Sequence, residues 1–318
     1  MPWVLRGLRL LLLLFSVSAA TFVLAELAPG DYLSAIRLDP RISEQTLGEL
    51  RQRYGLDAPL HERYLSWLAS VGRGELGFSF AHQRPVAELL LPRARNTLLL
   101  TGLATALCWA VALGVGTAAA LRPAGVVDRA TTLLVTLLLA VPELLLALAG
   151  LVVAASLPSL PLGGMASIDA EGLGFWARLG DLASHLVVPV AVLVLAGLPV
   201  LVAHVRTAVS EALEAGAVHA ARGHGIGGWR LLWGYVLPLA ANPLVSLFGF
   251  SFGALLSGSL LVEAVLGWPG IGPLLLEAVT ARDLHVVVAG VSGSCLFLAG
   301  GNGLADLILR RLDPRIEP

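Results

Sequence analysis

HAARGHGIGGWRLLWGYVLP, residues 219–238, separates two long apolar runs and decides how the chain is organised. It is too polar to span a bilayer, and its apolar residues recur too regularly for a plain linker. Helix-forming residues lead to Gly223, His224 and Gly225, and glycine ends helices because it adopts the left-handed conformation. Pro238 is tolerated in the first turn of a following helix. The stretch therefore predicts a short helix, a glycine turn and a new helix that re-enters the membrane.

The composition is that of a membrane protein. Hydrophobic residues make up 57% of the chain, charged residues 14%, and the mean hydropathy is +0.82. A soluble domain carries roughly 25% charged residues, so this chain has too few to cover a water-facing surface. The formal net charge of -1 leaves no basic excess to neutralise phosphates, so we expect a lipid bilayer and no nucleic acid as partner.

Six stretches are long enough to cross the membrane, because a helix needs about 20 apolar residues for a hydrocarbon core of roughly 30 Å. They lie near residues 8–28, 97–121, 131–155, 184–203, 239–262 and 286–309. The first follows Arg6 and Arg9 as a secretory signal would. The alternatives are a cleaved signal and a retained helix, and the absence of an Ala-x-Ala-like site favours the retained helix. We expect an all-α integral membrane protein with six transmembrane helices.

Arginines near the ends of these stretches predict the orientation. With the N-terminus inside, the inner segments hold ten arginines, whereas the two short outer loops hold only Arg178 and Arg282. Arg93 and Arg95, beside the second stretch, weigh mildly against this orientation. Cytoplasmic loops carry the basic excess, so we expect both termini in the cytoplasm.

This topology divides the chain into three parts. We expect an N-terminal transmembrane helix in 1–29, an extracytoplasmic loop region in 30–95, and a five-helix core in 96–318 with a cytoplasmic loop at 206–238. In 30–95, apolar residues recur at near-helical spacing with breaks at Gly55 and Pro59, which predicts two short amphipathic helices on the outer membrane surface.

Catalysis is disfavoured by the residues that the sequence lacks. All 21 basic residues are arginine, and a P-loop needs a lysine for the β- and γ-phosphates. His219 and His224 are five apart, on different helix faces, which disfavours a metal site. Intramembrane proteases would need two deep aspartates, or a histidine after Ser292 or Ser294. We expect no enzyme, cofactor or metal, and ATP bound by another chain.

Polar residues inside the apolar stretches are costly to bury in lipid and usually face a pathway or a partner helix. They are Glu143, Asn242, Glu263, Asn302 and Asp306. Glu143 is the deepest and, with Asn242, is our candidate for a translocation path, with plain helix packing as the alternative. For Glu263 and Asp306, which lie near predicted helix ends, helix capping or snorkelling is as good an explanation as a role in transport. Asn302 and Asp306 share a helix face, which suits hydrogen bonds between helices.

The opening stretch also resembles a known motif. Ala220-Ala221, three residues, Gly225, nine residues and Tyr235-x-Leu237-Pro238 resemble the cytoplasmic "EAA" loop of binding-protein-dependent ABC importer permeases. His219 stands where that motif often has Glu, and Tyr235 where it often has Ile. Further stretches along nearly the whole chain are similar to the dipeptide/oligopeptide/nickel permease subfamily. They are PGD at 29–31, LGELRQRYGLDAPLHERYLSWL at 47–68, GELGFSF at 74–80, RPVAELL at 84–90, NTLLLTG at 96–102, VDRATTLLVTLLLAVPELLLAL at 127–148, HLVVPVAVL at 185–193, VEAVLGWPGIGPLLLEAVTARD at 262–283 and LDPR at 312–315.

The resemblance implies a type I ABC importer permease fold, with helices around a central path. It implies a second homologous permease subunit, two cytoplasmic ATPase subunits that bind ATP, and an extracytoplasmic solute-binding protein. A coupling helix at about 214–229 would contact the ATPase, through a loop whose motif residues are His219, Ala220, Ala221, Gly225, Leu237 and Pro238. The implied function is ATP-driven import of peptides or similar small solutes, nickel chelates included, across the bacterial inner (plasma) membrane. An ATPase-independent channel or secondary transporter is the alternative.

Two further places, both in the last helix, depart from the subfamily's pattern. His285 follows Arg282-Asp283-Leu284, where proline is usual near the start of the last helix. The stretch 300–303, Gly-Gly-Asn-Gly, makes that helix unusually rich in glycine. Glycine lets membrane helices approach closely, so we expect a tight contact there, with the partner permease as the candidate.

Overall fold

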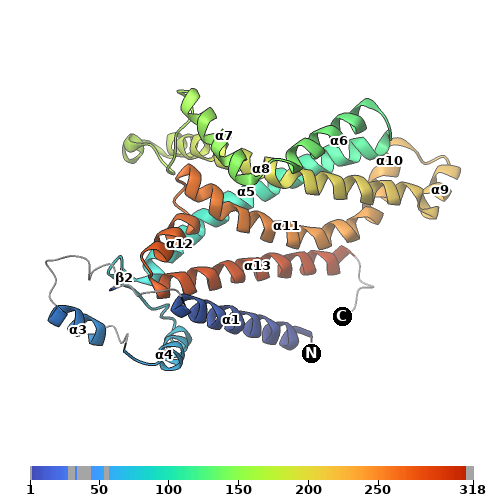
Figure 1. Cartoon of the computed structure of the whole chain (residues 1–318). Helices are drawn as coiled ribbons and strands as arrows, with labels where there is room; N and C mark the ends of the chain where they lie inside the picture. Colours follow the sequence, from blue (N-terminus) through green and yellow to red (C-terminus); the bar gives the residue numbers. More distant parts are fainter. Residues whose placement is uncertain (1, 28–32, 34–43, 54–56, 313–318) are drawn as a thin grey trace. The chain divides into compact units, whose positions relative to one another are not determined.

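The computed structural model describes residues 2–27, 33, 44–53 and 57–312, which are mostly helical (Figure 1). The PGD stretch at 29–31 and the end of the LDPR stretch lie outside these residues. The helices are α1 (Pro2–Leu27), α3 (Glu44–Arg53), α4 (Leu60–Gly72), α5 (Val86–Leu121), α6 (Val126–Leu139), α7 (Glu143–Ser156), the 3₁₀ helix η1 (Ile168–Gly172), α8 (Phe175–Glu214), α9 (Gly216–Gly223), α10 (Gly228–Leu231), the π-helical turn η2 (Leu232–Val236), α11 (Leu237–Leu266), α12 (Ile271–Thr280) and α13 (Leu284–Leu312). Strands β1 (Phe78–Ser79) and β2 (Arg84–Pro85) pair antiparallel. The chain forms two compact units: the first unit is residues 1–96 with 269–296, and the second unit is 97–268 with 297–318.

Five helices of the described residues are long and apolar enough to cross a membrane. They are Val4–Leu27, Val86–Leu121, Phe175–Glu214, Gly228–Leu266 and Leu284–Gly303. The pair α6 and α7 passes the same test as one broken span, which brings the number to the six that the sequence predicts. Several helices are longer than predicted: the second begins at Val86 rather than 97, and the fourth runs from Phe175 to Glu214 rather than from 184 to 203.

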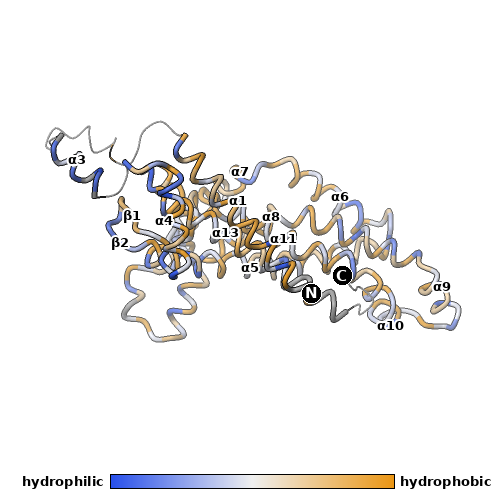
Figure 2. The backbone as a smooth tube through the Cα atoms, turned by 90° about the horizontal axis from the view of Figure 1, so that it is seen from below, coloured by the Kyte–Doolittle hydropathy of each residue, from blue (hydrophilic) through white to orange (hydrophobic). Residues whose placement is uncertain are grey.

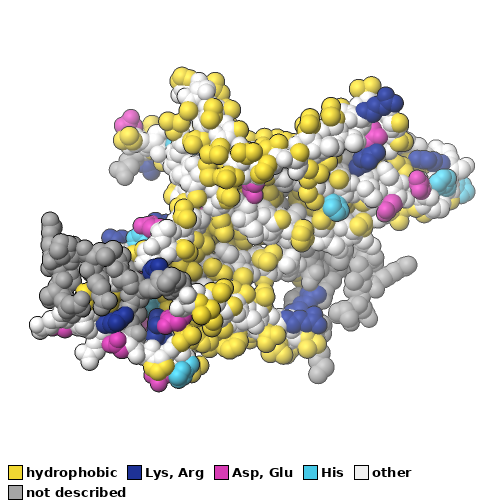
Figure 3. Space-filling model, viewed as in Figure 1, with side chains coloured by type: hydrophobic (Ala, Val, Ile, Leu, Met, Phe, Trp, Pro, Cys, Tyr) yellow, Lys and Arg dark blue, Asp and Glu magenta, His cyan; other side chains and the backbone are white. Residues whose placement is uncertain are grey.

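The predicted third span, residues 131–155, is wrong as a single helix, since α6 and α7 meet at a bend of 98°. The cause is Pro142, which has no N–H and whose ring blocks the carbonyl four residues earlier. Pro142 is extended, with φ −58° and ψ 142°. Ala140 and Val141 donate to carbonyls three residues earlier, so the end of α6 tightens before the break. Hydrophobic side chains are exposed over α6 and α7 (Figure 3), as lipid contact requires.

In the first unit, α1 and α4 pack through aromatic side chains. Phe22 and Trp67 are buried together with Val288, and the two ring centroids are 5.8 Å apart. The Tyr64 hydroxyl of α4 lies 3.0 Å from Ser18 Oγ of α1. This packing fixes α4 on the first helix of the chain.

The two short helices predicted between residues 30 and 95 are confirmed as α3 and α4. Pro59 precedes the first residue of α4, as the sequence predicts for a break at that position, whereas the predicted break at Gly55 lies outside the described residues. Figure 2 shows α3 as mainly hydrophilic and α11 as mainly hydrophobic. The position of α3 and α4 on a membrane surface stays a prediction.

The core of the second unit forms around α8, which contacts α6, α7 and α11 (Figure 1). Its buried face includes Leu193, Val202 and Val205, none of which is exposed by more than 2%. A side chain at Gly197 would meet Leu255 of α11 at 2.9 Å, so this glycine sets the close approach of the two helices. The second unit therefore packs as membrane helices do, with little space between backbones.

The glycine-rich stretch of α13 makes the tight contact that the sequence predicts, but within this chain. A Cβ at Gly301 would lie 2.5 Å from the Phe252 ring of α11, whereas Gly300 and Gly303 have open space. Asn302 is exposed, and the side chain of Asp306 lies outside the described part. A contact with a partner permease stays a prediction for the open face of Gly300 and Gly303.

Candidate coupling loop and transport path

The loop predicted to contact an ATPase begins where α8 ends. Ala215 is extended, with ψ 139°, and interrupts the helical backbone after Glu214. Its carbonyl oxygen accepts the N–H groups of Val218 and His219 at 3.0 and 3.2 Å, which starts the new helix α9. Because α9 spans Gly216–Gly223, the predicted helix of about 214–229 is shorter in the structure.

The two faces of α9 differ in exposure. Val218 and Ala221 are buried in the same core cluster as Val209 of α8. His219 and Ala220 are exposed. His219 Nδ1 lies 3.2 Å from the carbonyl oxygen of Ala215, the residue that precedes α9. One face of α9 is therefore fixed to the helical core, and the opposite face is open to a partner.

The end of α9 confirms the predicted glycine turn. Gly225 has φ +79°, the left-handed conformation that glycine adopts at little cost. Its N–H donates to the Arg222 carbonyl at 2.9 Å, and the Ile226 N–H donates to the Ala221 carbonyl at 3.0 Å. These two bonds form a Schellman motif, which satisfies the last carbonyls of the helix.

Pro238 lies in the first turn of α11 (Leu237–Leu266), as the sequence predicts, but the chain is already helical before it. Helical structure is continuous from Gly228 through the π turn η2 to Leu266, and Pro238 lies inside it. The Leu237 N–H donates to the Leu232 carbonyl, five residues earlier, so the turn holds one extra residue just before the proline. Backbone N–H groups in the π turn pair with carbonyls five residues earlier instead of four. This change comes directly before Pro238, which has no backbone N–H to donate. Leu237 is half-buried and Pro238 is exposed.

Glu143 begins α7 directly after the bend at Pro142. A Cβ at Gly258 of α11 would collide with the Glu143 carboxylate, so this side chain lies against a glycine of the neighbouring helix. Asn242, also in α11, is 16 residues from Gly258, which is about 24 Å along a helix. The structure therefore does not bring Glu143 and Asn242 together. Glu263, near the end of α11, is fully buried, so snorkelling to water does not explain it.

An ion pair joins α6 and α8, and it was not predicted from the sequence. Arg206 Nε lies 2.6 Å from Asp128 Oδ1, and Arg206 Nη2 donates to Asp128 Oδ2 at 3.1 Å. The Asp128 side chain is 8% exposed and also accepts the Ala124 N–H at 2.9 Å. The only sequence signal was an Asp and an Arg near the ends of two apolar runs, which does not specify a pair.

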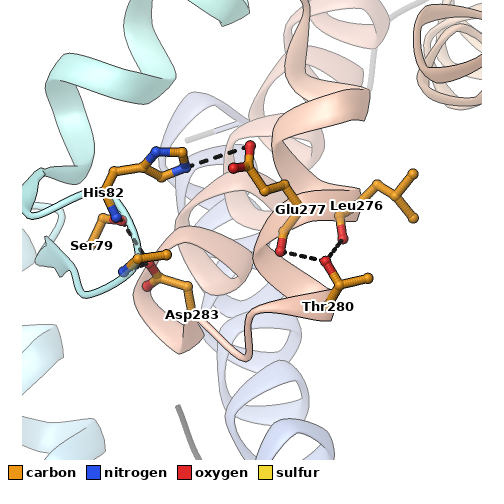
Figure 4. Close-up of polar contacts among 7 residues, drawn as sticks. Ser79, His82, Leu276, Glu277, Thr280 and Asp283 are labelled. Atoms are coloured by element: carbon orange, nitrogen blue, oxygen red, sulfur yellow. Dashed lines mark hydrogen bonds and ion pairs between the residues drawn. The ribbon is translucent and has the colours of Figure 1, made fainter. Parts of the chain in front are cut away.

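A second polar cluster, in the first unit, was also missed (Figure 4). Fully buried Asp283, between α12 and α13, accepts hydrogen bonds at Oδ2 from Ser79 Oγ at 2.6 Å and from the Ala81 N–H at 3.1 Å. His82 Nε2 lies 3.6 Å from Glu277 Oε2 of α12. His285 Nδ1–H donates to the Phe78 carbonyl at 3.0 Å, a bond that a proline could not make. The hairpin of β1 and β2 is thus held on the corner between α12 and α13.

These features define a class. The described residues form a mainly helical, multi-pass membrane protein with a short, half-exposed helix after its longest membrane helix. The model of the family "Binding-protein-dependent transport system inner membrane component" matches residues 110–318, and the N-terminal model of the same membrane components matches residues 3–101. The chain belongs to this family and is the permease component of a binding-protein-dependent ABC importer.

Curated relatives match over nearly their whole length. The chain is 30% identical to the oligopeptide transport system permease protein AppB of Bacillus subtilis, over 98% of both chains. It is 29% identical to the dipeptide permease DppB of Escherichia coli, over 100% of this chain and 99% of that one. It is 31% identical to the glutathione permease GsiC of Salmonella choleraesuis, over 98% and 97%.

A solved structure supports the fold. The MetNI methionine ABC transporter, in an inward-facing form, matches with a TM-score of 0.53 and 17% identity, over 71% of this chain and 96% of that chain. The predicted ABC importer permease fold is thereby confirmed. Family membership makes the chain a transport subunit that is not itself catalytic, and it implies ATPase and binding-protein partners.

Proposed function

We propose that this chain imports peptides or similar small solutes, nickel chelates included, into the bacterial cytoplasm. It acts with a second homologous permease subunit, two cytoplasmic ATPase subunits and an extracytoplasmic solute-binding protein. Both termini face the cytoplasm, the N-terminal helix lies in 1–29, the outer region in 30–95, and the permease core in 96–318. Peptide permeases of similar length among the relatives support the choice of solute.

The observation that carries this proposal is the two-faced helix α9. Its inner face, with Val218 and Ala221, is buried in the core that α8 and α11 share, whereas His219 and Ala220 are exposed. A force applied to the exposed face by an ATPase passes directly into the membrane helices, because packed cores deform little. The coupling loop therefore includes His219, Ala220, Ala221, Gly225, Leu237 and Pro238.

The solute path passes the bend between α6 and α7. Glu143 lies at this bend against Gly258, and a carboxylate that faced lipid would be costly. Asn242 lies on the same helix as Gly258 and nearer to the coupling loop. We assign Glu143 to the path and Asn242 to its cytoplasmic end.

Gly225→Val tests the coupling assignment in the complete transporter, reconstituted in vesicles with ATP inside and a labelled tripeptide outside. Valine in the left-handed conformation costs about 1–2 kcal/mol, so the turn after α9 distorts. We expect normal membrane insertion and a loss of ATP-driven uptake of about tenfold, within the range of coupling energies in proteins.

Gly227→Val is the matched control, since Gly227 has φ −142°, which valine adopts freely, and open space around it. This variant keeps full uptake. Full uptake by Gly225→Val would contradict the assignment. Uptake by this chain alone without ATP would instead support the channel or secondary transporter.

A further inference from the structure

The Asp128–Arg206 ion pair lies where the coupling loop meets the rest of the second unit. Arg206 is eight residues before the end of α8 at Glu214, after which α9 begins. Both guanidinium contacts reach the same carboxylate, at 2.6 and 3.1 Å. The guanidinium donates one hydrogen bond, from Nη2 to Oδ2, and makes a second close charge contact, from Nε to Oδ1, so two points of contact limit how the arginine can turn.

Asp128 also binds the turn between α5 and α6. It lies in the first turn of α6, where its charge interacts favourably with the helix dipole. It also accepts the N–H of Ala124 at 2.9 Å, and Ala124 has φ +61°, a conformation that needs support in a residue other than glycine. One carboxylate therefore holds the corner between α5 and α6 and connects that corner to α8.

The connection continues toward the solute path. From Asp128, α6 runs to the bend at Pro142, and Glu143 follows as the first residue of α7. At the other end, Val205 and Val209 flank Arg206 on α8 and are buried in the cluster that holds Val218 of α9. A displacement of α9 can therefore be transmitted to the other helices in two ways. One is along α8 itself, and the other is through the ion pair to α6.

Resting on the proposed function, we infer that Asp128 and Arg206 are positioning residues for coupling. They make α6 move with α8 and α9, so that the ATPase-driven displacement of α9 reaches the bend at Pro142 and Glu143. In this role they act through the helices that they join and not through contact with the solute or the ATPase. Their effect is on how much solute is moved per ATP hydrolysed.

The first test compares Asp128→Asn and Arg206→Gln in the complete transporter in vesicles, with ATP hydrolysis and uptake of a labelled tripeptide measured together. We expect basal ATP hydrolysis within about twofold of the unchanged protein and an uptake-to-ATP ratio lowered about tenfold. Arg206→Lys keeps the charge and loses the two-point contact, so its ratio is intermediate. Arg129→Gln, an exposed neighbour on α6, is the control and keeps the ratio. An unchanged ratio in both Asp128→Asn and Arg206→Gln overturns the inference.

The second test needs no solute and measures motion directly. Spin labels at Val126 of α6 and Ala217 of α9, both exposed, report the distance between the two helices with and without ATP and vanadate. We expect one narrow distance in both states for the otherwise unchanged chain, and a shifted or broader distribution with ATP and vanadate in Asp128→Asn.

If the distance already changes between the two states with the ion pair intact, α6 and α9 do not move together and the inference fails. Absence of ATP-driven uptake in the unchanged transporter instead contradicts the proposed function, and the distance measurement still decides the role of the pair. If Asp128→Asn does not assemble, Arg206→Gln replaces it, with the same expected broadening.

Discussion

Asp283 shows how much one buried carboxylate holds in place. Its Oδ2 accepts two hydrogen bonds from the hairpin, one from the Ser79 hydroxyl and one from the Ala81 N–H. Ser79 Oγ in turn accepts the His82 N–H at 3.1 Å. Loss of the carboxylate leaves these buried donors without their acceptor, which costs more than the contact itself contributes.

We therefore expect Asp283→Ala to destabilise the protein by about 3 kcal/mol, since hydrogen bonds to charged groups contribute roughly 1.5–3 kcal/mol each. Glu277→Ala is the matched control in the same cluster. Its carboxylate is largely exposed and 3.6 Å from His82, and such exposed pairs contribute about 0–1 kcal/mol. Thermal unfolding of the purified protein in detergent measures both. Equal unfolding temperatures for the two variants would show that Asp283 is not a structural anchor.

At this scale the sequence predicts little of the polar network, because pairing depends on tertiary position. Ser79 and Asp283 are 204 positions apart, and Asp128 and Arg206 are 78 apart. No local period or spacing connects such residues. Gly225 was predictable, since its left-handed conformation follows from its own chemistry and from the helix that precedes it.

At the scale of helices, the long apolar runs were predictable because the bilayer sets their length. The bend at Pro142 was not recognised, since hydropathy alone does not distinguish one helix of 25 residues from two helices that meet at 98°. The proline itself was the available signal. Pro189 and Pro199 lie inside continuous α8, so proline in a membrane helix does not by itself predict a break.

The contact of α13 with α11 gives a prediction at this scale. A leucine at Gly301 would overlap the Phe252 ring, so Gly301→Leu should destabilise the protein by about 1–3 kcal/mol, as overpacking does. Gly303 has open space, and Gly303→Leu should leave the unfolding temperature unchanged.

Copurification of the second permease subunit tests whether the open face of α13, at Gly303, contacts that subunit. If the open face meets the partner, Gly303→Leu lowers the recovered amount of that subunit although the chain itself remains stable. Unchanged recovery with Gly303→Leu would assign the open face to lipid. An unchanged unfolding temperature with Gly301→Leu would contradict the packing of α13 on α11.

For the whole molecule, the family and the helical architecture were predictable from motifs spread along the chain, and the comparisons confirm both. The choice of solute, the orientation in the membrane and the set of partner subunits rest on the proposed function. The orientation in the membrane and the contact with the ATPase depend on the coupling loop facing the cytoplasm. The contact between α9 and an ATPase subunit is thus the claim on which the account depends most.

Site-specific cross-linking measures this contact directly. His219→Cys places a single thiol on the exposed face of α9, after Cys108 and Cys295 are replaced, and a photoactivated thiol reagent is attached in the complete transporter. Trp176→Cys, exposed near the opposite end of α8, is the control. The account predicts an adduct with the ATPase subunit from position 219 and none from position 176. The absence of an ATPase adduct at 219, or equal adducts at both positions, would contradict it.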